Sequence, residues 1–173
     1  IIGAGAMGSA FSLPCLDNNH DINIVGTHLE NSFIDQLKKN DNLHPGLNTK
    51  IPKEIKIFKF EKFDEVLKSN VDLIVLGISS KGIEWVADQL SRLFKVSKIP
   101  KLLMLTKGLS IHNNKYELLV DKLERLLEDR AIKKVDISAA GGPCLAAGLA
   151  NRVHSSVVIA NKDIQTAKKI ADM

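Results

Sequence analysis

The amino-acid sequence predicts an α/β domain built around a mostly parallel β-sheet. Short apolar runs of strand length alternate with amphipathic segments of helix length from one end to the other, which is typical of this class. The 173 residues, of which 45% are hydrophobic, can bury one sizeable core. No internal repeat interrupts the alternation. We therefore expect one domain over residues 1–173.

The expected strands are apolar runs bounded by turn residues or polar residues. In chain order they cover residues 1–2, 22–25, 55–58, 73–77, 102–105, 135–139 and 155–160. The longest apolar run, residues 73–78, has the length of a buried strand and is far too short to cross a bilayer. We therefore expect no membrane span.

Apolar residues recur at helical spacing between these strands. Helices are expected over residues 7–17, 31–39, 62–68, 83–94 and 118–127, and from Asp163 onward. Residues 40–53 are expected to form a loop. Because the first strand is clipped to two residues and the last helix keeps its pattern to Met173, we expect the natural protein to extend beyond both ends.

Residues 3–8 fit the pattern G-x-G-x-x-G between a strand end and a helix start, the context in which this pattern binds dinucleotides. Each glycine has a separate expected task. Gly3 permits the tight turn, Gly5 leaves room for a pyrophosphate, and Gly8 lets the helix pack closely on the strand. The loop and the order of elements together predict a Rossmann-type doubly wound fold that binds NAD or NADP.

The residues that follow the loop bear on how the cofactor is held. Ala6 and Met7 lie at the helix start, where free N–H groups and the helix dipole favour an anion. NAD-binding domains usually carry an acid at the end of the second strand for the ribose hydroxyls. Here Thr27 and His28 stand at that place, each able to donate a hydrogen bond, with Glu30 just beyond. The choice between NAD and NADP stays open.

Several further blocks carry a resemblance to a known family. They are Asn18-Asn19-His20, Val25-Gly26-Thr27, His44-Pro45-Gly46, Gly77-Ile78-Ser79, Thr106-Lys107-Gly108-Leu109 and Gly142-Pro143-Cys144-Leu145-Ala146. With the glycine loop, their order and spacing resemble those of NAD(P)-dependent glycerol-3-phosphate dehydrogenases over essentially the whole sequence. The last two blocks discriminate best, because the family has Thr-Lys-Gly-Leu and Gly-Pro-Ser-Phe-Ala there.

The resemblance implies an oxidoreductase that interconverts dihydroxyacetone phosphate and sn-glycerol 3-phosphate, a phospholipid precursor, by hydride transfer with NAD or NADP. It implies that Lys107 is catalytic and contacts both substrate and cofactor, its ammonium polarising the carbonyl oxygen. Gly142 and Cys144 would bind substrate, while Ser79 and Ala146 would lie at the cofactor. The family's second catalytic lysine and its phosphate site belong to a helical domain, which we expect after Met173.

Three positions depart from the family pattern. Gly148 stands where the family usually has Glu, Ile78 where it has Pro, and Cys144 where it has Ser or Thr. No histidine lies beside Cys144 in sequence, and hydride transfer needs no thiolate. We therefore expect Cys144 to pack or to replace the hydroxyl, not to act as a nucleophile.

Composition limits the partners. The 24 basic residues exceed the 20 acidic ones by four and are spread along the chain, which disfavours nucleic acid and is consistent with a small phosphorylated substrate. Two unpatterned cysteines favour neither a disulfide framework nor a metal site, so a reducing compartment, the cytoplasm, is expected. No signal peptide is visible. A homodimer is left open.

Two other functions compete with this interpretation. The glycine loop also resembles that of ketopantoate reductases, which reduce a small 2-keto acid with NADPH, but their Asn-Gly block after the fifth strand is absent here. A nucleotide-sensing domain without catalysis would keep the loop but would need no lysine at the position of Lys107.

Overall fold

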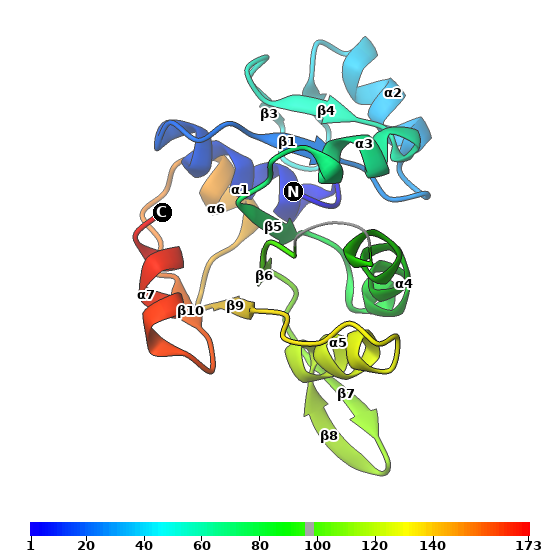
Figure 1. Ribbon diagram of the computed structural model, residues 1–173. Coiled ribbons are helices and arrows are strands. Elements are labelled where there is room, and N and C mark those ends of the chain that lie inside the picture. Colours follow the sequence, from blue (N-terminus) through cyan, green and yellow to red (C-terminus); the bar gives the residue numbers. More distant parts are fainter. Residues whose placement is uncertain (96–98) are drawn as a thin grey trace.

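The computed structural model describes residues 1–95 and 99–173 and shows a β-sheet with helices on both faces (Figure 1). The strands lie in the order β4 (Lys56–Phe58), β1 (Asn23–Val25), β5 (Leu73–Leu76), β6 (Lys101–Met104), β9 (Ile137–Gly141) and β10 (Val158–Ala160). Ile2 bridges Val25 and Leu76, so it joins β1 to β5. Within this sheet the pairings are parallel except that of β10 with β9, which confirms the predicted mostly parallel sheet.

The helices are α1 (Ala6–Asp17), α2 (Asn31–Lys39), α3 (Phe63–Lys68), α4 (Ile83–Phe94), α5 (Leu119–Glu128), α6 (Ala146–Ala150) and α7 (Ile164–Ala171), with 3-10 turns η1 (Phe60–Lys62) and η2 (Ser80–Gly82). Side chains of a strand alternate between the two faces of a sheet. Ile74 and Leu76 pack with α3, α4 and α5, whereas Val75 packs on the face of α1 and α7. Helices therefore cover both faces, as the predicted doubly wound fold requires.

Some expected boundaries were wrong. The 40–53 loop contains a small antiparallel hairpin of β2 (Leu43–His44) and β3 (Thr49–Lys50). The strand expected from residue 155 begins at Val158, and the last helix ends at Ala171. Leu118, expected in a helix, ends a strand instead. Asp163 does open the last helix, because its carboxylate accepts the N–H groups of Gln165 and Thr166.

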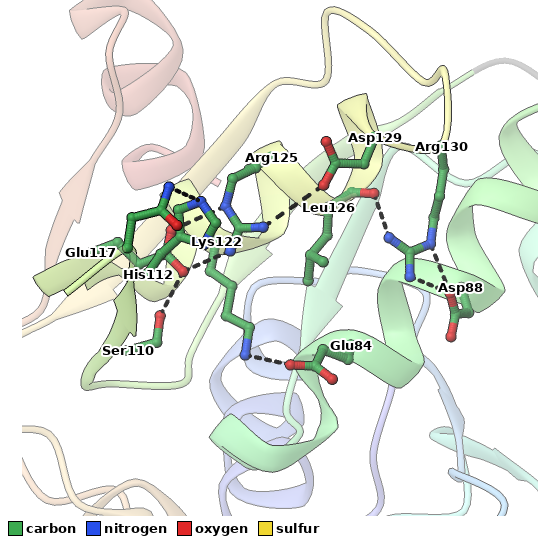
Figure 2. A network of polar contacts seen from close by, with 11 residues as sticks. Glu84, Asp88, Ser110, His112, Glu117, Lys122, Arg125, Leu126, Asp129 and Arg130 are labelled. Carbon is green, nitrogen blue, oxygen red and sulfur yellow. Dashed lines mark hydrogen bonds and ion pairs between the residues drawn. The ribbon is translucent and has the colours of Figure 1, made fainter. Parts of the chain in front are cut away.

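A second hairpin, β7 (Leu109–His112) with β8 (Lys115–Leu118), projects from the body directly after Lys107 (Figure 1). Its apolar side chains point away from the protein and are 56% to 78% exposed: Leu109, Ile111, Tyr116 and Leu118. Glu117, on the opposite face, accepts hydrogen bonds from Arg125 of α5 at 2.8 and 3.3 Å and from Ser110 at 3.0 Å (Figure 2). Polar contacts therefore attach this hairpin to α5.

Ion pairs also join α4 to α5 and to Arg130, which follows α5. Lys122 Nζ lies 2.8 Å from Glu84 Oε1, and Arg130 Nε donates to Asp88 Oδ1 at 2.7 Å (Figure 2).

Over the residues that the structure describes, none of the helices combines the length and the apolar character that crossing a membrane requires.

Candidate functional site

The glycine loop runs from Gly3 to Gly8, between the sheet and α1. Gly3 has a φ of +103°, and a Cβ atom added to it would lie 2.7 Å from the carbonyl oxygen of Gly77. A Cβ atom added to Gly8 would lie 2.3 Å from the carbonyl oxygen of Gly3. Both distances are too short for any side chain, so strand, turn and helix approach this closely only because glycine occupies both positions.

Gly5 differs from Gly3 and Gly8 because no backbone atom lies close to the position of an added Cβ atom. Apart from its chain neighbours, the heavy atom nearest to an added Cβ atom is Glu30 Oε1, at 3.7 Å. Gly5 is also the N-cap of α1, which no side chain caps and whose first turn holds no acid. The N–H groups of Ala6 and Met7 therefore lie at an uncapped helix N-terminus, which favours an anion. These N–H groups and the open space beside Gly5 form a cradle that fits the pyrophosphate of a dinucleotide.

Glu30 reaches back from the start of α2 to the glycine loop. Its Oε1 accepts the backbone N–H of Ala4 at 3.1 Å, and its Oε2 accepts the backbone N–H of Thr27 at 2.7 Å. The carboxylate therefore joins the loop to the end of β1. The sequence places Glu30 just beyond the strand end, but no local pattern shows that its side chain folds back over the turn to the glycine loop.

The carbonyl oxygen of Ala4 is held from another side. It accepts hydrogen bonds from Ser9 Oγ at 2.9 Å and from His44 Nε2 at 3.3 Å. A carbonyl oxygen only accepts, so Nε2 carries the proton, and Nδ1 has no partner among the described residues. His44 is 3% exposed, and this burial lowers the pKa of its imidazole. The β2–β3 hairpin thus supports the loop with a neutral histidine.

Thr27 and His28 follow β1 at the carboxyl edge of the sheet. Thr27 is half-buried and His28 is exposed. The His28 ring centroid lies 5.0 Å from that of Trp85 and 6.2 Å from that of Phe60. The three rings form an aromatic surface beside the ends of β1, β4 and β5, and such a surface suits a flat heterocycle.

Ser79 and Lys107 follow β5 and β6, and both are exposed. The hydroxyl of Thr106 donates to the carbonyl oxygen of Ile78 at 2.6 Å, which ties the two loops together. Lys107 takes part in none of the ion pairs formed by the described residues. Its ammonium is therefore available at the edge where open α/β sheets bind ligands.

Residues from three separate sequence blocks meet at one small hollow. Met7, Lys107 and Cys144 line it together with Phe11, Leu105, Ala140, Gly141, Leu149 and Val157, and its volume is about 20 Å³. That is room for about one water molecule, so the three blocks lie in close contact. A larger groove of about 630 Å³ runs beside β4 and the end of α2, and none of the predicted site residues lines it.

The block after β9 is shaped by close backbone contacts. Gly142 has a φ of +107°, and a Cβ atom added to it would lie 2.6 Å from the carbonyl oxygen of Ser156. Cys144 is 7% exposed, and Ala146 begins α6, which packs against α1. Cys15, the other cysteine, stays protonated because burial raises its pKa to about 11. In residues 1–95 and 99–173, no three His, Cys, Asp or Glu side chains are arranged to hold a metal ion.

Comparison with known proteins gives one consistent family. Residues 1–167 match the model of the family described as "NAD-dependent glycerol-3-phosphate dehydrogenase N-terminus". The chain is 30% identical to the NADP(+)-dependent glycerol-3-phosphate dehydrogenase of Archaeoglobus fulgidus, over 100% of this chain and 49% of that protein. It is 26% identical to a glycerol-3-phosphate dehydrogenase [NAD(P)+] of Bacillus pumilus, over 100% and 47%. The chain thus spans about half the length of these curated relatives.

Solved structures share the fold. The chain superposes on glycerol-3-phosphate dehydrogenase from Coxiella burnetii with a TM-score of 0.80 and 19% identity, over 99% of this chain and 48% of that one. For the glycerol-3-phosphate dehydrogenase of Plasmodium falciparum the TM-score is 0.77 and the identity 20%, over 98% and 47%.

Proposed function

Because the chain belongs to the family of NAD-dependent glycerol-3-phosphate dehydrogenase N-termini, we propose that it is the nucleotide-binding part of an enzyme that interconverts dihydroxyacetone phosphate and sn-glycerol 3-phosphate. The cofactor is NAD(H) or NADP(H). The observation that carries the proposal is the meeting of Met7, Lys107 and Cys144 at one hollow, because it joins the glycine-loop helix to the two family blocks that discriminate best.

The cofactor would extend across the carboxyl edge of the sheet. Its pyrophosphate would meet the open cradle at Gly5, Ala6 and Met7. The adenosine end would lie toward Thr27 and His28. Ser79 and Ala146 would then lie nearer the nicotinamide, which supplies the hydride chemistry when bound.

Lys107 would act on the substrate carbonyl. An ammonium that donates a hydrogen bond to the carbonyl oxygen withdraws electron density and stabilises the alkoxide that forms as the hydride arrives. Its exposure and its lack of an ion pair among the described residues support this role, since a paired lysine would first have to release its partner. Backbone groups at Gly142 and Cys144 would hold the rest of the substrate. The second catalytic lysine and the phosphate site would lie outside residues 1–173.

The test is an assay of the full-length protein with dihydroxyacetone phosphate, following oxidation of NADH and NADPH. We expect turnover with dihydroxyacetone phosphate, none with ketopantoate, and a loss of kcat of about 10²-fold or more in Lys107→Ala. Lys133→Ala is the matched control, because this exposed lysine precedes β9 and so lies at the opposite edge of the sheet. Turnover with ketopantoate alone would indicate the reductase, and bound nucleotide without turnover would indicate a sensor. A cytoplasmic location and a homodimer stay predictions.

A further inference from the structure

The β7–β8 hairpin turns its apolar face outward. Two cross-strand pairs of apolar residues form this face, and their side chains are 56% to 78% exposed: Leu109 with Leu118, and Ile111 with Tyr116. The opposite face is polar, and its Glu117 accepts hydrogen bonds from Ser110 and from Arg125 of α5 (Figure 2). Antiparallel strands with one solvated face usually turn their apolar face to the protein body. This hairpin does the reverse.

Such a hairpin needs a cover on its outer face. A two-stranded hairpin is at best marginally stable in water by itself. The ion pair of Arg125 with Glu117, whose side chains are 30% and 14% exposed, supports only the inner face. Opposite residues of neighbouring strands lie close together, so the four outer side chains form one contiguous apolar patch, and such patches mark surfaces that contact another body. Residues 1–95 and 99–173 leave this patch exposed.

The position of the hairpin indicates what covers it. β7 begins two residues after Lys107, and the proposed function, on which this inference rests, places further catalytic groups outside residues 1–173. About half of the relatives from Archaeoglobus fulgidus and Bacillus pumilus lies outside the part that this chain matches, which leaves ample chain for a cover. The groups that act with Lys107 have to approach it, so the part that carries them lies against the base of the hairpin. A second copy of this chain seated there would compete for the same space.

Further exposed apolar side chains lie beside Lys107. Val157 is 42% exposed and lines the same hollow as Lys107 and Cys144, and Leu145, the next residue in the chain, is 72% exposed. A single body seated over the hollow would cover these side chains together with the hairpin. We propose that the outer face of the β7–β8 hairpin is the docking surface for the part of the full-length protein outside residues 1–173. This contact and the bond to α5 then hold the hairpin from both faces.

The test is a crosslink in the full-length protein. A photoreactive benzophenone analogue of phenylalanine takes the place of Tyr116, an exposed aromatic residue at the centre of the outer face. We expect illumination to join this position to residues outside 1–173 of the same chain, seen by mass spectrometry in a band of monomer size. The same analogue in place of Ile164 is the control, because this residue is 62% exposed but follows β10 at the opposite edge of the sheet.

A second measurement needs no crosslink. Ile111→Ser should lower the Tm of the full-length protein by about 2 °C or more, because truncation of a covered apolar side chain is costly. Ile164→Ser, the matched control, should change Tm by less than about 1 °C. A band of dimer size, crosslinks confined to residues 1–173, or an unchanged Tm in Ile111→Ser overturns the proposal. Neither measurement uses substrate or cofactor, so the docking surface can be confirmed even if the activity assay shows that the proposed function is wrong.

Discussion

Arg152 and Asp17 form an ion pair with two hydrogen bonds, from Nε to Oδ2 at 2.8 Å and from Nη2 to Oδ1 at 2.9 Å. They are 135 residues apart in sequence. Asp17 ends α1, and Arg152 follows α6, so the pair fixes α6 against the helix that begins at the glycine loop. Two parallel bonds give the contact a defined geometry. Both side chains are about half exposed, which limits what the pair adds to stability.

Arg152→Ala should therefore change binding more than folding. We expect KM for substrate or cofactor to rise several-fold with a small change in Tm, because α6 begins at Ala146, which the proposed function places at the cofactor, and a small displacement would disturb that contact. Steady-state kinetics and thermal unfolding measure the two effects. Arg92→Ala removes a comparable exposed pair with Asp64 and should leave KM unchanged. An unchanged KM in Arg152→Ala would contradict the positioning role.

Two glycines of the loop should respond in opposite ways to the same substitution. Gly8→Ala places a methyl group 2.3 Å from a backbone oxygen, so we expect a loss of roughly 1–3 kcal/mol in the free energy of unfolding. Gly5→Ala places it in open space, so Tm should hold while nucleotide binding weakens at least about tenfold. Urea unfolding and nucleotide titration separate the cases. Unimpaired binding in Gly5→Ala would argue against the cradle.

The stability of the protein should depend on the charge of His44. Burial lowers the pKa of His44 below its ordinary value of 6.5, so the unfolded chain takes up the proton first as the pH falls. The stabilisation is fully present above about 6.5 and is lost as the pH falls through the lower folded pKa. Urea midpoints measured from pH 8 to pH 5 should fall less in His44→Gln, whose amide keeps a donor for Ala4 but does not titrate. Parallel curves for the two proteins would exclude this dependence.

Much of the fold follows from patterns within short stretches of sequence. The expected bounds of α2 match the observed Asn31–Lys39, because its apolar residues recur at helical spacing between polar ones. The β7–β8 hairpin was missed because its apolar face is turned outward, so it carried no signal of burial. Asn113 and Asn114, with φ of 49° and 59°, form the tight turn that was the available clue.

The site was harder to predict where its parts are held by distant residues. The three glycines form a local sequence pattern. The close contacts expected at Gly3 and Gly8 and the open space expected beside Gly5 are observed, while pyrophosphate binding there stays a prediction. The bonds from Glu30 and His44 to Ala4 join residues 26 and 40 positions apart, and no local pattern specifies them. The ion pair of Arg152 with Asp17 likewise becomes apparent only once α6 is packed on α1.

The manner in which the β7–β8 hairpin is attached has a consequence for Lys107, its close neighbour in the chain. Added salt strengthens the burial of apolar groups in many cases but weakens attraction between charges. The apolar core and the Arg125–Glu117 ion pair, which attaches the hairpin to α5, should therefore respond in opposite ways to ionic strength. Hydrogen exchange should quicken in β7 and β8 as salt rises, while the central strands stay protected. Lys107, the proposed catalytic lysine, would then gain or lose mobility with the ionic composition of its surroundings, at constant overall stability.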